Sequence, residues 1–204
     1  LAQPNGMKRS LRVVVVTESF LPQVNGVTNS VLRILEYLRA QGHQALVIAP
    51  ESAGGVSEYA GFRVKRVPSL EMKGLLPLGF PQKTMEPLID GFNPDVVHLA
   101  SPFFLGNYAS KVAERLGIPT LSIYQTDIAG FARHYGLTMA HDSLKRWVAK
   151  IHSRTTRTLA PSNWSRWSNT SASKSSPWAV KSVLNNASAT CCSRPQRKVI
   201  SSRV

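Results

Sequence analysis

Short apolar runs alternate with amphipathic stretches through most of the chain. Brief aliphatic runs that are rich in valine and bounded by turn residues are typical of strands buried on both faces. Apolar residues spaced three and four apart predict helices between these strands. The predicted strands cover residues 11–17, 45–49, 62–67, 95–99, 119–124 and 157–160. The predicted helices cover residues 27–41, 83–90, 105–116 and 143–153.

This alternation of strands and helices predicts an α/β fold, with a Rossmann-like parallel sheet covered by helices on both faces. Ligands of such sheets bind beyond the carboxyl ends of the strands. The loops that follow predicted strands are therefore the places to look for a site. They are residues 18–26, 100–103, 125–135 and 161–162.

The alternating pattern stops near residue 162, where the composition also changes. All 11 acidic residues lie at or before Asp142, whereas residues 163–204 contain seven basic residues, eleven serines and no acidic residue. We therefore predict an N-terminal extension (1–10), a folded domain (11–162) and a basic, serine-rich tail (163–204). We expect this tail to be irregular and disordered, as in a truncated chain or a coding sequence read out of frame.

Composition excludes several classes of protein. A hydrophobic content of 43% is too high for a wholly disordered chain. The longest aliphatic run, Val13–Val16, is far shorter than the roughly 20 residues that span a bilayer, and it is too brief for a signal peptide. Cys191 and Cys192 are adjacent and cannot form a disulfide framework or a metal site by themselves. We expect a cytoplasmic protein without a bound metal ion.

Asn25 and Gly26 stand at the entrance to the first predicted helix. Free backbone N–H groups and the helix dipole favour an anion there. Glycine permits close approach to the backbone, and asparagine can cap the helix. The segment has neither the glycines of a dinucleotide fingerprint nor the lysine of a P-loop, which disfavours an NAD enzyme or a P-loop ATPase. A plain capped turn explains the two residues equally well.

The segment 124–127 (Tyr-Gln-Thr-Asp) places a carboxylate directly after a predicted buried strand. Asp127 is therefore a candidate base or hydroxyl-positioning group. His134 and Tyr135 follow within two helical turns and are candidates for holding a polar substrate. A turn or N-cap aspartate is the alternative explanation of Asp127.

Five segments in this order carry a family likeness. They are residues 17–28 (TESFLPQVNGVT), 42–43 (GH), 94–98 (PDVVH), 124–127 (YQTD) and 158–162 (TLAPS). Each motif alone is weak, but the ordered set resembles the N-terminal half of family-4 glycosyltransferases. The likeness covers about residues 11–162 and extends to the actinobacterial GDP-mannose-dependent α-mannosyltransferases, which act on glycolipid acceptors.

This resemblance implies a GT-B enzyme, in which two Rossmann-like domains enclose the active site between them. The domain at hand would be the acceptor-side half. The reaction implied is transfer of a hexose, here mannose, from a nucleotide sugar such as GDP-mannose to a lipid or glycan acceptor with retention. No resident cofactor is implied. Residues 163–204 do not resemble the donor-binding domain that follows in relatives, so we expect a truncated chain.

The resemblance also assigns roles to individual residues. Gly26 matches the loop glycine whose backbone meets the donor phosphate. Tyr124 to Asp127 match the segment that holds the catalytic or acceptor-orienting residue. Gln125 stands where many relatives have histidine, and a glutamine cannot act as a general base. The role of base then falls on Asp127, unless the leaving phosphate takes the acceptor proton and Asp127 only orients the hydroxyl.

The alternative hypothesis is an inactive basic fragment that binds an anionic lipid surface or nucleic acid, since the net charge is +14. Several basic residues crowd one region, which would suit peripheral contact with the anionic inner face of the plasma membrane. They are Lys145, Arg146, Lys150, Arg154 and Arg157. A solvated helix face explains them equally well. No nucleic-acid-binding fold is recognisable, and we do not expect a nucleic-acid partner.

Overall fold

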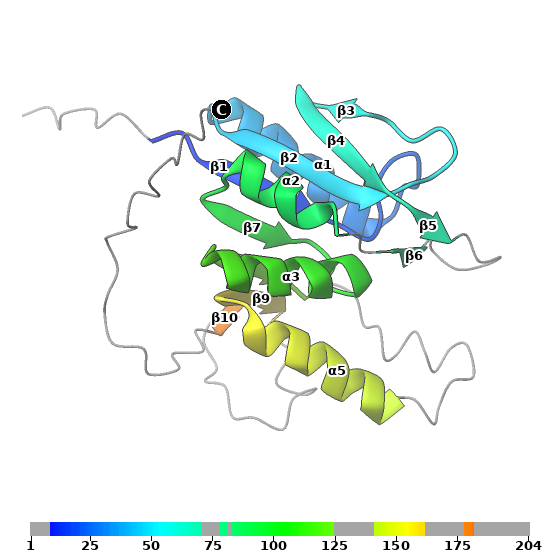
Figure 1. The fold of residues 1–204 in the computed structure, drawn as a ribbon, viewed down its shortest axis with the longest axis vertical. Coiled ribbons are helices and arrows are strands. Elements are labelled where there is room, and N and C mark those ends of the chain that lie inside the picture. Colours follow the sequence, from blue (N-terminus) through cyan, green and yellow to red (C-terminus); the bar gives the residue numbers. More distant parts are fainter. Residues whose placement is uncertain (1–8, 71–77, 81–82, 125–140, 162–177, 182–204) are drawn as a thin grey trace, which may run out of the picture.

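The structure is a computed structural model that describes residues 9–70, 78–80, 83–124, 141–161 and 178–181 (Figure 1). In chain order the elements are β1 (Arg12–Val16), α1 (Gly26–Ala40), β2 (Gln44–Pro50), β3 (Glu58–Tyr59), β4 (Phe62–Val67), β5 (Ser69–Leu70), β6 (Leu78–Gly79), α2 (Met85–Phe92), β7 (Val96–Leu99), α3 (Phe104–Leu116), β8 (Thr120–Ile123), α5 (His141–Arg154), β9 (Arg157–Pro161) and β10 (Trp178–Lys181).

The described strands form one large sheet in the order β10-β9-β8-β7-β1-β2-β4-β3. The six strands from β9 to β4 in this order run parallel to one another, while β3 and β10 pair antiparallel at the two edges. If the six parallel strands are numbered along the chain and the sheet is read from β4 to β9, their order is 3-2-1-4-5-6, which is the Rossmann arrangement. The predicted fold class is thus confirmed.

Two apolar cores flank the sheet because alternate strand residues point to opposite faces. On one face, Val13 and Val15 of β1 pack with Leu35 and other residues of α1. On the other face, Val14 and Val16 pack with α2 and α3. The ribbon shows α1 behind the sheet and α2 and α3 in front of it (Figure 1). Burial on both faces explains why the central strands are almost purely aliphatic.

The predicted strands and helices all occur, with ends that differ from the predictions by one or two residues. The helix expected at 83–90 is α2, and it accommodates Pro87 because the proline lies in the first turn, where backbone N–H groups have no intrahelical acceptor. Four strands, β3, β5, β6 and β10, were not predicted. The first three have only two residues each, which is too short to show a period.

The strand β10 lies in the segment that we expected to be an irregular tail. It pairs antiparallel with β9, with Ala179 opposite Ala160. Backbone hydrogen bonds to an edge strand need little from the side chains, so composition does not reveal such pairing. One strand does not make a domain, and the division of the chain at residue 162 stays a prediction.

Candidate functional site

The sheet reverses its strand order between β1 and β7, and this is where open α/β sheets bind ligands. The loop after β1 runs from Thr17 to Asn25 and leads into α1. The turn after β7 runs from Ala100 to Phe103 and leads into α3. The two connections touch, because the backbone N–H of Glu18 donates to Ser101 Oγ at 3.1 Å. The helices α1 and α3 therefore begin beside each other at this edge of the sheet.

The N-terminus of α1 is held by a network of short polar side chains. Asn25 is the N-cap, and its Oδ1 accepts a hydrogen bond from the N–H of Thr28 at 2.9 Å. Asn25 Nδ2 donates to Ser19 Oγ at 2.7 Å, and Ser19 Oγ lies 3.1 Å from Thr28 Oγ1. The first turn contains no acidic residue that would compete with an anionic ligand. Asn25 thus has a defined structural role that fixes the position of Gly26.

Gly26 has no structural reason to be a glycine. Its φ lies outside the left-handed region, and a Cβ added there would meet no other atom of the described residues within 4 Å. A helix gains stability when glycine is replaced by alanine, so the glycine costs stability without easing a turn or a contact. A glycine here also leaves room for a ligand to approach the backbone closely. This position at the switch point suits a phosphate group.

The N-terminus of α3, by contrast, is already occupied. Its N-cap residue, Phe103, has no capping side chain, and Glu18 Oε1 takes that place by accepting from the N–H groups of Phe103 at 3.3 Å and Gly106 at 3.1 Å. Glu18 is only 7% exposed. Burial raises the pKa of Glu18 to about 7, although the backbone hydrogen bonds oppose the rise.

Arg66 of β4 fastens the loop after β1 to the neighbouring strands. Its Nη2 donates to the carbonyl oxygen of Leu21 at 2.8 Å, and Nη1 donates to that of Pro50 at 2.9 Å. Nε and Nη2 both reach the carbonyl oxygen of Val56. The guanidinium also lies 5.6 Å from the ring centroid of Phe20. One side chain thus connects three separate segments.

A buried polar cluster lies where β8 and β9 meet α5. Ser122 Oγ lies 3.0 Å from His152 Nδ1, 3.0 Å from Thr155 Oγ1 and 2.8 Å from Thr158 Oγ1. The rings of Tyr124 and His152 meet edge to face, with centroids 5.6 Å apart. The cluster is a positioning element, because it fixes the end of β8 directly before the candidate segment that begins at Tyr124.

Stability should fall as the pH drops from about 6.5 to 4. Burial lowers the pKa of His98 and of His152 to about 4, so the unfolded chain binds protons in this range that the folded chain does not. Each histidine should contribute about 3 kcal/mol of stability that is present above pH 6.5 and lost near pH 4. Urea unfolding at a series of pH values measures this loss.

The matched variant for this prediction is His98→Leu, which removes one of the two buried imidazoles. Its unfolding free energy should depend less steeply on pH than that of the wild type. Glu18 acts in the opposite sense, because its raised pKa stabilises the fold at low pH, so the difference between the two proteins is the quantity to compare. Equal slopes would show that His98 does not titrate as described.

The structure places three of the seven predicted site residues. Asn25 and Gly26 lie together at the start of α1, and Tyr124 follows β8 two strands away. The other four, Gln125, Asp127, His134 and Tyr135, lie outside the described residues. No individual role was predicted from the sequence for Glu18, Arg66 or His152. Glu18 directly follows the first strand and its Thr17, which is a usable signal, whereas the partners of Arg66 and His152 are distant along the chain.

Comparison with known proteins identifies the family. Residues 24–170 match the sequence pattern of Glycosyltransferase Family 4. The chain belongs to Glycosyltransferase Family 4. The match spans most of the chain, includes the candidate site, and confirms the predicted resemblance. It does not favour the alternative of an inactive basic fragment.

Several curated relatives of this family-4 chain are similar to its N-terminal part. The GDP-mannose-dependent α-mannosyltransferase of Corynebacterium glutamicum is 47% identical over 162 residues, which are 77% of this chain and 39% of the relative. The protein of that name in Mycobacterium tuberculosis is 50% identical over 158 residues, 74% of this chain and 42% of the relative. The α-monoglucosyldiacylglycerol synthase of Streptococcus pneumoniae is 26% identical over 128 residues, 61% of this chain and 29% of the relative. The chain therefore spans less than half the length of these relatives.

Proposed function

We propose that this family-4 chain is the acceptor-side half of a GT-B glycosyltransferase that moves mannose from GDP-mannose to a lipid or glycan acceptor. The observation that carries the proposal is Gly26, which starts α1 beside the switch point of the sheet and whose Cβ position has no described atom within 4 Å. The names of two relatives at 47% and 50% identity support GDP-mannose as the donor.

The stereochemistry of this reaction is retention. GDP-mannose carries mannose in the α configuration, and the relatives are named α-mannosyltransferases. The nucleotide sugar is a substrate, and the proposal requires no resident cofactor or metal ion. Gly26 would receive the donor phosphate through its backbone N–H, and Asn25 would keep the helix start in place.

The acceptor hydroxyl belongs, in this proposal, near the segment that follows β8. Asp127 orients or deprotonates the hydroxyl. Tyr124, with its ring against His152, positions the start of the segment. Gln125, His134 and Tyr135 bind the polar part of the acceptor.

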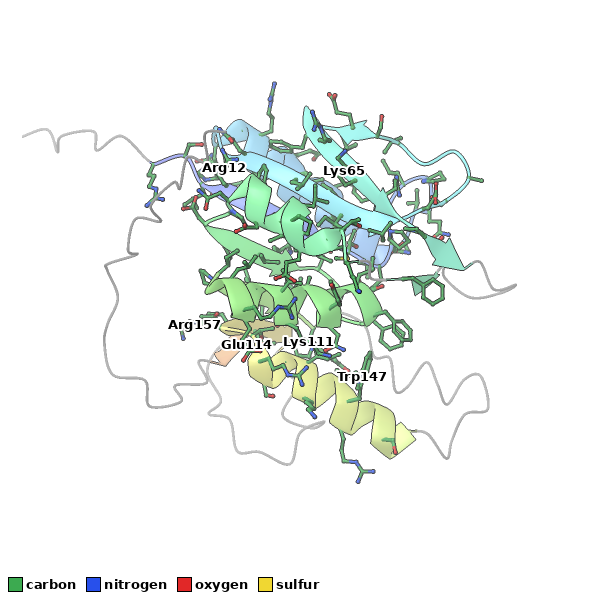
Figure 2. All side chains as sticks on the ribbon, viewed as in Figure 1. Arg12, Lys65, Lys111, Glu114, Trp147 and Arg157 are labelled. Carbon is green, nitrogen blue, oxygen red and sulfur yellow. The ribbon has the colours of Figure 1, made fainter. Side chains whose placement is uncertain are left out.

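A lipid acceptor suits one end of the described surface. Phe103, Phe104 and Trp147 form an aromatic cluster in which Phe103 lies 4.5 Å from Phe104 and 4.9 Å from Trp147, between ring centroids. Trp147 lies on the side of α5 that faces the start of α3 (Figure 2), and Phe104 is 40% exposed. Arg146 and Lys150 on α5 are exposed. We propose a cytoplasmic location with peripheral contact with an anionic membrane. No described helix is long and apolar enough to cross a membrane.

Removing two charges tests this membrane contact. Arg146 and Lys150 are exposed and one turn apart on α5, so both would face anionic headgroups. Arg146→Gln with Lys150→Gln should weaken binding to vesicles containing phosphatidylglycerol by about 10-fold or more, because each basic residue near such a surface contributes about 1 kcal/mol. The control pair Arg33→Gln and Arg39→Gln on α1 should bind as the wild type does. Equal losses in both pairs would indicate a nonspecific effect of net charge.

A chimera tests the proposed reaction. Residues 1–162 would replace the matching N-terminal part of the Mycobacterium tuberculosis relative, which supplies the rest of its own chain. The chimera should transfer mannose from GDP-mannose to the acceptors that the parent uses, as measured by mass spectrometry of the products. A folded chimera without transfer activity, beside an active parent, would contradict the proposal.

In this chimera, Gly26→Ala should separate stability from activity. The added Cβ meets no described atom within 4 Å, so the free energy of unfolding should be unchanged or rise by up to about 1 kcal/mol. The same methyl group would crowd a phosphate on the helix start, so the KM for GDP-mannose should rise by about 10-fold or more. Steady-state kinetics and urea unfolding measure the two effects.

Gly91→Ala is the matched control, because Gly91 lies in α2 and its added Cβ also meets no described atom within 4 Å. It should leave the kinetics unchanged. An unchanged KM in Gly26→Ala would show that Gly26 is not part of the donor site and is only a residue of a capped turn.

A further inference from the structure

Glu18 is a buried carboxyl group that the proposed reaction does not use. It follows the end of β1 and lies against the first turn of α3, where its Oε1 accepts from the N–H groups of Phe103 and Gly106. Its Oε2 is also buried but has no hydrogen-bond partner among the described residues. A buried, ionised carboxylate oxygen without a hydrogen-bond partner destabilises the fold, and protonation of the carboxyl group reduces this destabilisation.

The next residue connects this carboxyl group to the proposed phosphate site. Ser19 Oγ receives a hydrogen bond from Asn25 Nδ2 and contacts Thr28 Oγ1. Two consecutive residues therefore engage the first turns of two helices, Glu18 that of α3 and Ser19 that of α1. A change in the charge of Glu18 can reach the start of α1 in two ways. Ser19 is the next residue in the chain, and the electric field of the carboxylate extends to the helix start through surroundings of low dielectric constant.

We propose that Glu18 is a positioning residue whose protonation sets the affinity of the α1 N-terminus for a phosphate group. This inference rests on the proposed function, which places the donor phosphate at Gly26. An ionised Glu18 repels a phosphate that approaches the same edge, whereas a neutral Glu18 does not. By linkage, phosphate binding then raises the proton occupancy of Glu18, and the proton comes from the solvent.

The surroundings of Glu18 put this exchange in the neutral range. Burial raises its pKa to about 7, and the groups that oppose the rise are the backbone N–H groups of Phe103, Leu105 and Gly106. Ser101, in the turn after β7, accepts a hydrogen bond from the backbone N–H of Glu18 and is uncharged. No charged side chain of the described residues contributes to the pKa of this group.

The test uses the isotopically labelled 204-residue chain and sulfate, whose charge stays constant between pH 5.5 and 8.5. The shift of the Gly26 amide on titration gives the dissociation constant at each pH, and the ¹³C shift of the Glu18 carboxyl gives its own midpoint. The wild type should bind sulfate at least about fivefold more tightly at pH 5.5 than at pH 8.5. The midpoint of this change should match that of Glu18.

Two variants complete the test. Glu18→Gln keeps the shape and removes the charge, so its affinity for sulfate should be independent of pH and equal to that of the wild type at pH 5.5. Glu114→Gln removes an exposed carboxylate from α3 (Figure 2) and should keep the pH dependence of the wild type. Both measurements are independent of transfer activity, so they separate this proposal from the proposed reaction.

A wild-type affinity that does not change with pH would overturn the proposal, whether or not Glu18→Gln folds. A pH dependence that persists in Glu18→Gln would also overturn it and assign the effect to another group. If sulfate shifts the Gly26 amide at no pH, the phosphate site is wrong and the proposal falls with it, whereas an inactive chimera alone would count only against the reaction.

Discussion

Asp127→Asn in the chimera should lower kcat by about 100- to 10,000-fold, which is the usual contribution of a group that transfers or orients a proton. Asparagine keeps the shape of the side chain and removes its charge and its basicity. Gln125 cannot replace it, because an amide does not take up a proton at neutral pH. Steady-state kinetics with saturating GDP-mannose measure the effect.

Stability is the control in this experiment, because an aspartate that only caps a turn is replaced by asparagine at little cost. The midpoint of thermal unfolding should therefore hardly change. A variant within a few-fold of the parent in kcat would assign Asp127 to structure. The leaving phosphate would then be the group that accepts the acceptor proton.

Leu105→Ala should destabilise the fold by about 3 kcal/mol, the largest loss of stability that we predict for a single core position. The side chain is fully buried in the core between the sheet and the helices α2 and α3. It also lies beneath β6, because a Cβ added to Gly79 would sit 2.6 Å from Leu105 Cδ1. Removing the side chain leaves a cavity that this rigid site cannot close. Urea unfolding followed by circular dichroism measures the loss.

The same substitution at an exposed leucine provides the control. Leu11 is 36% exposed, and Leu11→Ala should change the unfolding free energy by no more than about 0.5 kcal/mol. Gly79→Ala tests whether Gly79 and Leu105 share this packing site. Its added methyl group should destabilise the wild type by overpacking, and it should lower the unfolding free energy less in the Leu105→Ala background. Additive effects would show that the two residues do not share one packing site.

The fold was predictable because its signal is local. The valine run of β1 and the apolar stripe of α1 are each recognisable within a short stretch of sequence. The order of such strands and helices along the chain then limits the sheet to a few possible topologies. The short strands lack such a signal. β10, for example, depends on the presence of β9 beside it and not on its own four residues.

The candidate site was predictable only where its chemistry follows the chain. Asn25 caps the helix that it precedes, and that relation spans three residues. Glu18 instead acts on Gly106, 88 residues away, and Ser122 meets His152 across 30 residues. Such contacts exist only once the sheet has assembled, so spacing along the chain does not reveal them.

Arg66 has a consequence for how tightly a ligand binds. Its guanidinium joins the loop after β1 to the end of β2 and to the turn at Val56, so the loop is held in one conformation before any ligand arrives. If the loop adopted the binding-competent conformation only part of the time, the apparent affinity would be the intrinsic affinity multiplied by that fraction. The entropy of ordering this loop is lost during folding, so a ligand that binds beside it would not have to compensate for that loss.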